Sequence, residues 1–205
     1  MSNKILCLIN GEYNGPINIT NASNSIIISK VDFKSRLVDH KKGTGLILYN
    51  CQNITIKGMI FAKCLNGIWL KNSSNCSIQN NIIRADEGSA LVINESSRNN
   101  TIMANTIFSD QKNEEPAVVI ENSDNNMIIG NDITKPKGYS YLLKNGYGNK
   151  LYLSNDCIVL SENDIYIIKA LDVNGIAKRS FFLYIDQGMY KELGGKIEDG
   201  NNWYC

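Results

Sequence analysis

Apolar residues occur along most of the chain in short runs, separated by polar segments that are rich in asparagine. The stretch NGIWLKNSSNCSIQNNII (66–83) is typical, because its apolar runs are too short for a helix. Isoleucine and valine are frequent in such runs, and both residue types favour strands. The pattern therefore predicts short strands that are joined by sharp polar corners.

The pattern also repeats along the chain. GLILYNCQNITIKGMIF (45–61) matches GIWLKNSSNCSIQNNII (67–83), and related copies follow at 90–107, 117–133 and 140–157. A less regular copy precedes them at 17–33. Aligning the copies gives two apolar columns: Leu48, Leu70, Ile93, Ile120 and Leu143, and Ile27, Ile56, Ile78, Ile102, Ile128 and Tyr152. Because one copy is too short to enclose a core, the copies are expected to stack as coils.

Two further columns consist of asparagine. The first contains Asn24, Asn53, Asn75, Asn99, Asn125 and Asn149, and the second contains Asn81, Asn105, Asn131 and Asn155. Asparagine tolerates the left-handed backbone of a sharp corner, and stacked amides can bond the next coil. We expect the second column to form a structural ladder of hydrogen bonds, and the Asn53, Asn75 and Asn99 column to be buried in a stack.

The pattern G-I-x-L-x-x-S-x-x-C/N-x-I-x-x-N-x-I resembles the right-handed parallel β-helix repeats of the pectin-lyase-like superfamily. It is especially similar to the carbohydrate-binding and sugar-hydrolase repeats, and to the family of the periplasmic copper-binding factor that matures nitrous oxide reductase. The resemblance covers about residues 10–157. It implies an all-β protein with a right-handed parallel β-helix of five to six coils over residues 1–157.

After residue 157 the strands become longer and alternate, with hairpin signals at Asp172–Gly175 and around Gly188 and Gly194. This predicts a small antiparallel β domain over residues 158–205. The segment 162–205 resembles part of the S-layer-related domain of surface proteins from methanogenic archaea, through Glu162, Tyr166, Asp172, Asn174, Gly175, Phe182, Leu183, Gly200 and Tyr204. That resemblance implies an extracellular or cell-surface protein.

The bulk composition narrows the possible partners. The net charge is +1, so the surface gives no reason to expect nucleic acid as a partner. No apolar run reaches the length of a membrane span. The start MSNKILCLINGEY is too short for a signal peptide, so the protein is either intracellular or preceded by a leader that this chain lacks. The six cysteines show no metal-ligand spacing and read as core residues, although their even number permits disulfides.

Few residues suggest chemistry, and the motifs of sugar-cleaving β-helices are absent. The insertion SDQKNEEP (109–116) contains Asp110, Glu114 and Glu115, and Asp86 and Glu87 lie at the same expected corner. These carboxylates are the catalytic candidates if the protein is an enzyme, and they could hold calcium. Otherwise no cofactor and no metal is expected, because the single histidine, His40, has no second ligand nearby. Glu121 and Lys144 are expected to be neighbours and to form a surface ion pair.

One outward row is unusually apolar. If Ile68 and Leu70 point into the coil, strand alternation turns Ile47, Trp69, Val92, Val119 and Leu142 outward. Such a row is expected either to be covered by a loop or by the following domain, or to contact a partner. The partner would be a cell-envelope glycan or a surface-layer protein.

Seven Asn-x-Ser/Thr sites also occur, at Asn18, Asn21, Asn53, Asn72, Asn75, Asn94 and Asn99. They are possible glycosylation sites if the protein is exported. The sequence favours a non-enzymatic surface scaffold with a glycan- or partner-binding face. The alternative is a polysaccharide lyase, hydrolase or epimerase, and copper delivery has the weakest support.

Overall fold

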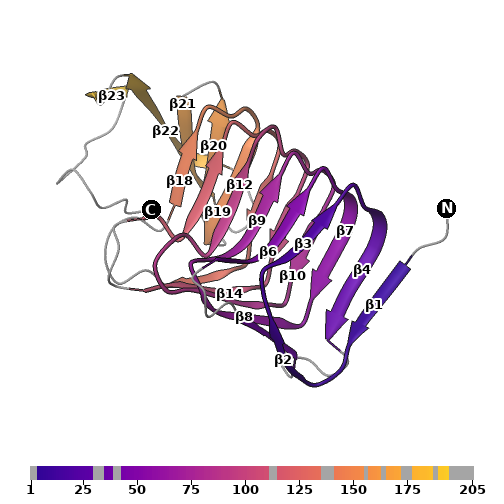
Figure 1. The fold of residues 1–205 in the computed structure, drawn as a ribbon. Coiled ribbons are helices and arrows are strands. Elements are labelled where there is room, and N and C mark those ends of the chain that lie inside the picture. Colours follow the sequence, from indigo (N-terminus) through magenta and orange to yellow (C-terminus); the bar gives the residue numbers. More distant parts are fainter. Residues whose placement is uncertain are drawn as a thin grey trace.

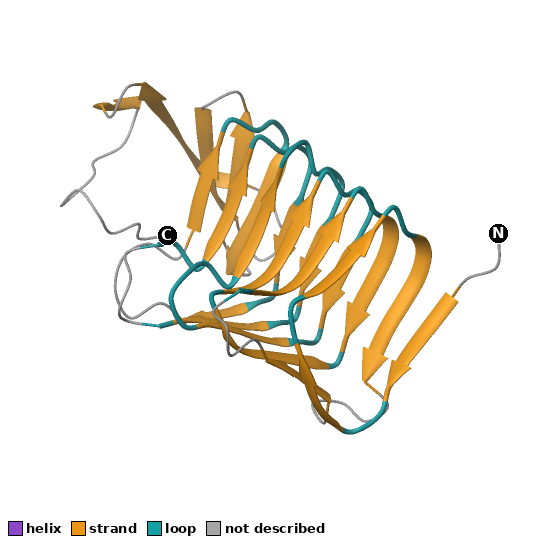
Figure 2. Cartoon of the chain, in the orientation of Figure 1, coloured by secondary structure: helices purple, strands orange, loops and turns teal. Residues whose placement is uncertain are grey.

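The chain forms three parallel β-sheets that run along the length of a solenoid (Figure 1). The computed structural model describes residues 4–29, 35–38, 43–110, 115–134, 141–154, 157–162, 165–171, 177–186 and 189–193, with the backbone alone from residue 153 onward. These residues contain strands and connecting turns and no helix (Figure 2). Nothing in this part of the chain is a helix that could cross a bilayer.

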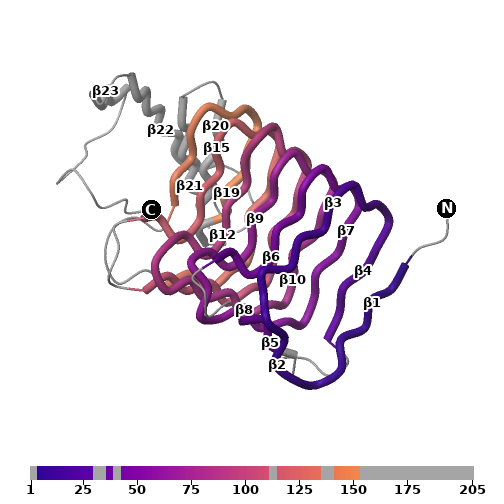
Figure 3. Tube along the Cα trace, in the orientation of Figure 1, coloured from indigo at the N-terminus to yellow at the C-terminus, as the bar shows by residue number. Residues whose placement is uncertain are grey.

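Each coil contributes one strand to each sheet, so strands three apart in the sequence lie side by side (Figure 3). Sheet A begins with β1 (Lys4–Leu8), β4 (Ser23–Ser29), β7 (Gln52–Lys57), β10 (Ser77–Gln79), β13 (Thr101–Met103), β16 (Met127–Ile129) and β19 (Asn149–Ser154). Sheet B contains β2 (Gly11–Asn14), β5 (Ser35–Val38), β8 (Met59–Cys64), β11 (Ile82–Ala85), β14 (Thr106–Ser109) and β17 (Asp132–Thr134). Sheet C contains β3 (Ile17–Thr20), β6 (Thr44–Tyr49), β9 (Asn66–Lys71), β12 (Leu91–Asn94), β15 (Val118–Glu121) and β18 (Tyr141–Lys144).

Beyond β19 the pairing changes from parallel to antiparallel. Sheet A continues through β20 (Cys157–Glu162), β21 (Ile165–Leu171), β22 (Ala177–Asp186) and β23 (Met189–Leu193). Each of these strands pairs antiparallel with the one before it. The prediction of a parallel solenoid followed by antiparallel strands is therefore confirmed.

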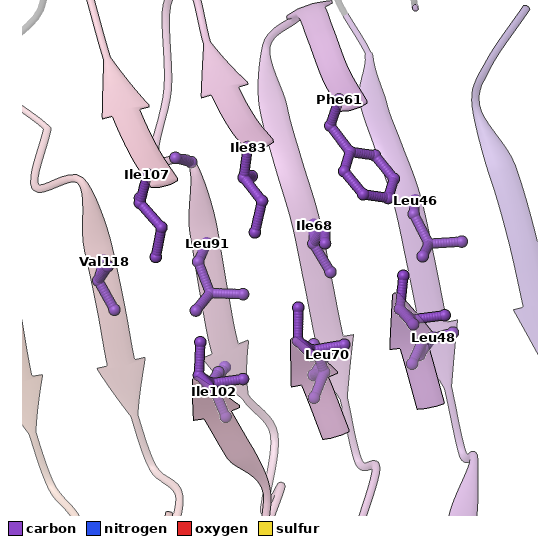
Figure 4. Close-up of a cluster of buried hydrophobic side chains, with 14 of the residues drawn as sticks. Leu46, Leu48, Phe61, Ile68, Leu70, Ile83, Leu91, Ile102, Ile107 and Val118 are labelled. Atoms are coloured by element: carbon purple, nitrogen blue, oxygen red, sulfur yellow. The ribbon is translucent and has the colours of Figure 1, made fainter. Parts of the chain in front are cut away.

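The core is built from inward rows of aliphatic side chains (Figure 4). In sheet C, Leu48, Leu70, Ile93 and Ile120 pair from strand to strand, as the first apolar column predicted. All four are almost fully buried. Burial of such side chains is worth about 1.5–3 kcal/mol each, which a single coil could not supply for itself.

The second apolar column is right except in the last coil. Ile56, Ile78, Ile102 and Ile128 are in register, but the next member is Leu151 and not Tyr152. The left-handed corner position of that coil is occupied by Gly148, with φ 67°, and not by an asparagine. The alignment therefore slipped by one residue, and the position predicted for Asn149 belongs to Gly148.

Asparagines at the corner between sheets A and B form a buried ladder. The Nδ2 of Asn81 donates to the Oδ1 of Asn105 at 3.0 Å, and the Nδ2 of Asn105 donates to the Oδ1 of Asn131 at 2.9 Å. The same amides also donate to backbone carbonyls, as from Asn105 to Ile78 at 2.8 Å. Asn155, the fourth expected member, lies outside the described residues.

A second buried ladder, which the sequence columns did not identify, lies at the corner between sheets C and A. Here Asn100 donates to Asn126 and Asn126 donates to Asn149, each at 3.0 Å. The preceding residues Asn99 and Asn125 have φ near 55° and point outward.

The expectation that Asn53, Asn75 and Asn99 are buried is therefore wrong, because all three are exposed. They occupy the left-handed residue of the corner, and the side chain that enters the core belongs to the residue after them.

Candidate binding face on sheet C

The outer surface of sheet C has a continuous apolar row. Strand pairing joins Ile47 to Trp69, Trp69 to Val92, Val92 to Val119 and Val119 to Leu142. Neighbouring strands lie about 4.8 Å apart, so the five side chains form one strip along the solenoid. The first four are half-buried, and Leu142 is 39% exposed. Each residue of the row thus keeps part of its surface accessible.

Trp69 is held in place by polar contacts on both sides of its strand position. Its indole Nε1 donates to the Oδ1 of Asn94 at 2.8 Å, and the ammonium of Lys71 lies 4.6 Å from the ring centroid. Lys71 is itself paired with Glu95 at 2.9 Å. A cation over an indole contributes about 0.5–1 kcal/mol at an exposed site. These contacts fix the ring on the sheet before any partner arrives.

A polar rim follows the apolar row. Tyr49 pairs with Lys71, and Lys71 pairs with Asn94, so their side chains lie beside the strip. Tyr49 is 46% exposed. Further along, Glu121 and Lys144 are strand neighbours and form an ion pair at 2.9 Å, as predicted. An apolar centre with a polar rim is the usual composition of a protein-binding surface.

The predicted acidic corner lies elsewhere, between sheets B and C. Asp110 is 3.8 Å from Arg84, and Asp86 is 3.4 Å from the same guanidinium. Arg84 also stacks over Phe108, 5.1 Å from the ring centroid. Glu115 is exposed, and Glu114 lies outside the described residues. The sequence reasoning gave Arg84 no role, although its position one strand before Asp86 was the available signal.

The carboxylates at this corner are not arranged as metal ligands. The described residues contain no group of three or more His, Cys, Asp or Glu side chains that could hold a metal ion. Asp86 and Asp110 flank a guanidinium instead, so the described part of this corner gives no support to the calcium site.

The predicted glycosylation sites are mostly accessible. Asn18, Asn21, Asn53, Asn72, Asn75 and Asn99 are exposed, and Asn94 is half-buried beneath its hydrogen bond to Trp69.

Solved structures similar to this chain share its fold. An alginate lyase from Paenibacillus sp. str. FPU-7 is 16% identical, with a TM-score of 0.50 over 70% of this chain and 58% of that protein. A candidate glycosyl hydrolase from Parabacteroides merdae ATCC 43184 is 15% identical, with a TM-score of 0.47 over 70% of this chain and 82% of that protein. The chain therefore spans less than two thirds of the lyase. A search of curated proteins found no match.

A family model gives the clearest relationship. The model described as "Periplasmic copper-binding protein (NosD)" matches residues 3–165, which include every coil of the solenoid. The surface-layer resemblance of residues 162–205 finds no support in these comparisons. The chain belongs to the NosD family of parallel β-solenoid proteins.

Proposed function

We propose that the protein is a non-catalytic solenoid of the cell envelope that binds a partner protein through the outer face of sheet C. The observation that carries this proposal is the accessible apolar row of Ile47, Trp69, Val92, Val119 and Leu142. A solvated sheet face is normally polar, and a contiguous apolar strip with a polar rim is typical of interaction sites. The periplasmic description of the family supports the envelope location.

The composition of the row favours a protein over a glycan. Four of its five members are branched aliphatic side chains, which pack well against the apolar side chains of another protein. A sugar ring would depend mainly on Trp69, whose ring already has Lys71 near one face. An envelope glycan is therefore the weaker partner and becomes one outcome of the test.

The family description names copper, but the described side chains do not fit a copper site. Copper sites use several histidine, cysteine or methionine ligands, and cysteine binds metal as a thiolate. Burial raises the pKa of the Cys76 thiol to about 11, and burial also raises the pKa of Cys51. Both thiols therefore stay protonated at neutral pH. The only histidine, His40, lies outside the described residues. No copper step is proposed.

A carbohydrate-active enzyme is the second candidate, and one observation favours it. Arg84 lies between the carboxylates of Asp86 and Asp110, and Glu115 is at the same corner. A lyase needs carboxylates together with a basic side chain, and a hydrolase needs a pair of carboxylates at a set separation. Here the ion pairs with Arg84 engage the two acids, which makes this the weaker proposal.

The two proposals are separated by one experiment. The purified protein is incubated with envelope fractions and with a panel of polysaccharides, with and without calcium, and both retention and new sugar ends are measured. The scaffold proposal expects retention by the envelope fraction without new reducing ends and without the absorbance of an unsaturated product. New sugar ends would contradict it. Any activity should then be lost in the variant Asp110→Asn, Glu114→Gln, Glu115→Gln, and retained activity in that variant would exclude the acidic corner.

A further inference from the structure

The corner between sheets C and A carries a groove on its outer side. It has a volume of about 380 Å³ and runs across four successive coils. Its lining consists of Asn21, Ala22, Ser23, Asn50, Cys51, Gln52, Asn72, Ser74, Ser96 and Arg98. The groove is thus separate from the apolar row, which lies on the flat face of sheet C.

The groove ends at the coil that has one residue more than its neighbours. The other coils turn this corner through a single left-handed asparagine, such as Asn50, Asn72 or Asn122. The fourth coil uses two left-handed residues, Glu95 with φ 52° and Ser96 with φ 64°. The residues of the next coil do not line the groove. The extra residue therefore marks its end, next to Arg98.

Most of the lining can both donate and accept hydrogen bonds. Side-chain amides run along one side, where Asn50 donates to Asn21 at 2.5 Å and Asn72 donates to Asn50 at 3.4 Å. Amides and hydroxyls offer donor and acceptor atoms together, which matches the hydroxyl groups of a sugar. An apolar ligand would find only Ala22 and the buried Cys51.

Arg98 supplies the only charge in the lining. It is exposed and forms no ion pair with any described residue. The neighbouring acids have other partners, since Glu95 pairs with Lys71 at 2.9 Å and Asp124 accepts a hydrogen bond from the backbone N–H of Tyr147 at 2.9 Å. Its guanidinium is thus available for an anion, and a carboxylate can accept two parallel hydrogen bonds from it.

The shape of the groove favours an extended ligand. Gln52, Ser74 and Arg98 are paired in register along the axis, and four coils span roughly 14 Å at the spacing of neighbouring strands. A small anion would use Arg98 and leave the amides and hydroxyls without a role. A nucleic acid would need more cations than one arginine and a net charge of +1 supply.

We propose that this groove binds a linear acidic oligosaccharide, extended along the solenoid axis, with a carboxylate on Arg98 and hydroxyl groups on the lining amides. The site is independent of the partner-binding face of sheet C. The protein would then hold a glycan at one corner and a protein on the adjoining face.

Calorimetric titration with an oligogalacturonate tests this proposal. The matched ligand is the same oligosaccharide with every carboxyl methyl-esterified, which removes the charge and keeps the hydroxyl groups. We expect the acidic form to bind at least about tenfold more tightly than the ester. Arg98→Gln should weaken binding of the acidic form by a similar factor, and higher salt should weaken it in the wild type. Ser74→Leu should fill the groove and reduce binding of both forms.

The controls separate this site from other surfaces. Lys150→Gln removes one exposed cation from sheet A and should leave the affinity unchanged. Val119→Lys alters the partner-binding face and should also leave it unchanged, so failure of either proposal is recognisable by itself. Absence of binding to the wild type, equal affinity for acid and ester, or full affinity in folded Arg98→Gln would each overturn the proposal.

Discussion

Sheets A and C have the same inner construction and different outer surfaces. Both bury inward rows of isoleucine and leucine almost completely. On the outside, sheet A carries a row of mainly polar character, which consists of Thr55, Ser77, Thr101, Met127 and Lys150. Sheet C carries Ile47, Trp69, Val92, Val119 and Leu142 at comparable outward positions.

The difference shows what the fold requires and what it leaves open. Parallel pairing and the inner rows are present in both sheets, so sheet A demonstrates that the coils stack with threonine, serine and lysine outside. The apolar outer row of sheet C is therefore not needed to close the solenoid. An interaction with another molecule gives that row a reason to be apolar.

The sharpest contrast between inside and outside is found at two adjacent residues of β9. Leu70→Ala should lower the free energy of unfolding by about 2–5 kcal/mol, because Leu70 is fully buried between coils. Trp69→Ala should lower it by only about 1 kcal/mol, through loss of the contact with Lys71. Urea unfolding followed by far-ultraviolet circular dichroism measures both. Equal losses would mean that the outer row is part of the core.

The same contrast holds for asparagines at the corners. Asn105→Ala should cost about 2–3 kcal/mol, because it leaves the backbone carbonyl of Ile78 and the amide of Asn131 without their buried partner. Asn53→Gly should change stability by less than about 0.5 kcal/mol, because glycine accepts its φ of 55° and the side chain is exposed. A large loss in Asn53→Gly would contradict the outward assignment of that column.

The buried thiols give the inner rows a pH dependence. Since burial raises the pKa of Cys76 from 9.0 to about 11, the unfolded chain loses the thiol proton first. Stability should be fully retained below pH 9 and should fall as the pH rises through 11. Cys76→Ala should reduce this fall relative to the wild type in urea titrations at pH 8 and pH 10.5. Parallel curves for the two proteins would show that the thiol is not desolvated.

The smallest effect is expected at the rim of sheet C. Lys144→Ala breaks the exposed pair with Glu121 and should cost about 0.5 kcal/mol or less. High salt should remove most of that difference in thermal unfolding. A loss above 1 kcal/mol would assign the rim a structural role and weaken the contrast between the two faces.

The sequence predicted the coil stacking because inward residues recur with the coil. The alignment placed Leu48, Leu70 and Ile93 correctly, and it turned Trp69 outward by simple alternation. It could not decide which of two adjacent asparagines enters the core. In Asn99-Asn100 and Asn125-Asn126 the first residue takes the left-handed conformation and the second is buried, and both look alike as letters.

The candidate sites depended on features that repeats do not report. The pairing of Arg84 with Asp110 joins residues that are 26 positions apart, through the register of β11 and β14. The groove beside Arg98 depends on one extra residue in the fourth coil, which the alignment absorbed as a change in spacing. Neither feature follows from the consensus of the repeat.

The most direct test of the binding face compares one lysine substitution on each sheet. Val119→Lys and Thr101→Lys both place a charge at a half-buried outward strand position, so both should fold with similar stability. Retention by the envelope fraction is then measured by sedimentation for each variant. The account predicts that Val119→Lys loses retention by at least about tenfold and that Thr101→Lys keeps it. Equal retention of the two variants would contradict the assignment of sheet C as the binding face.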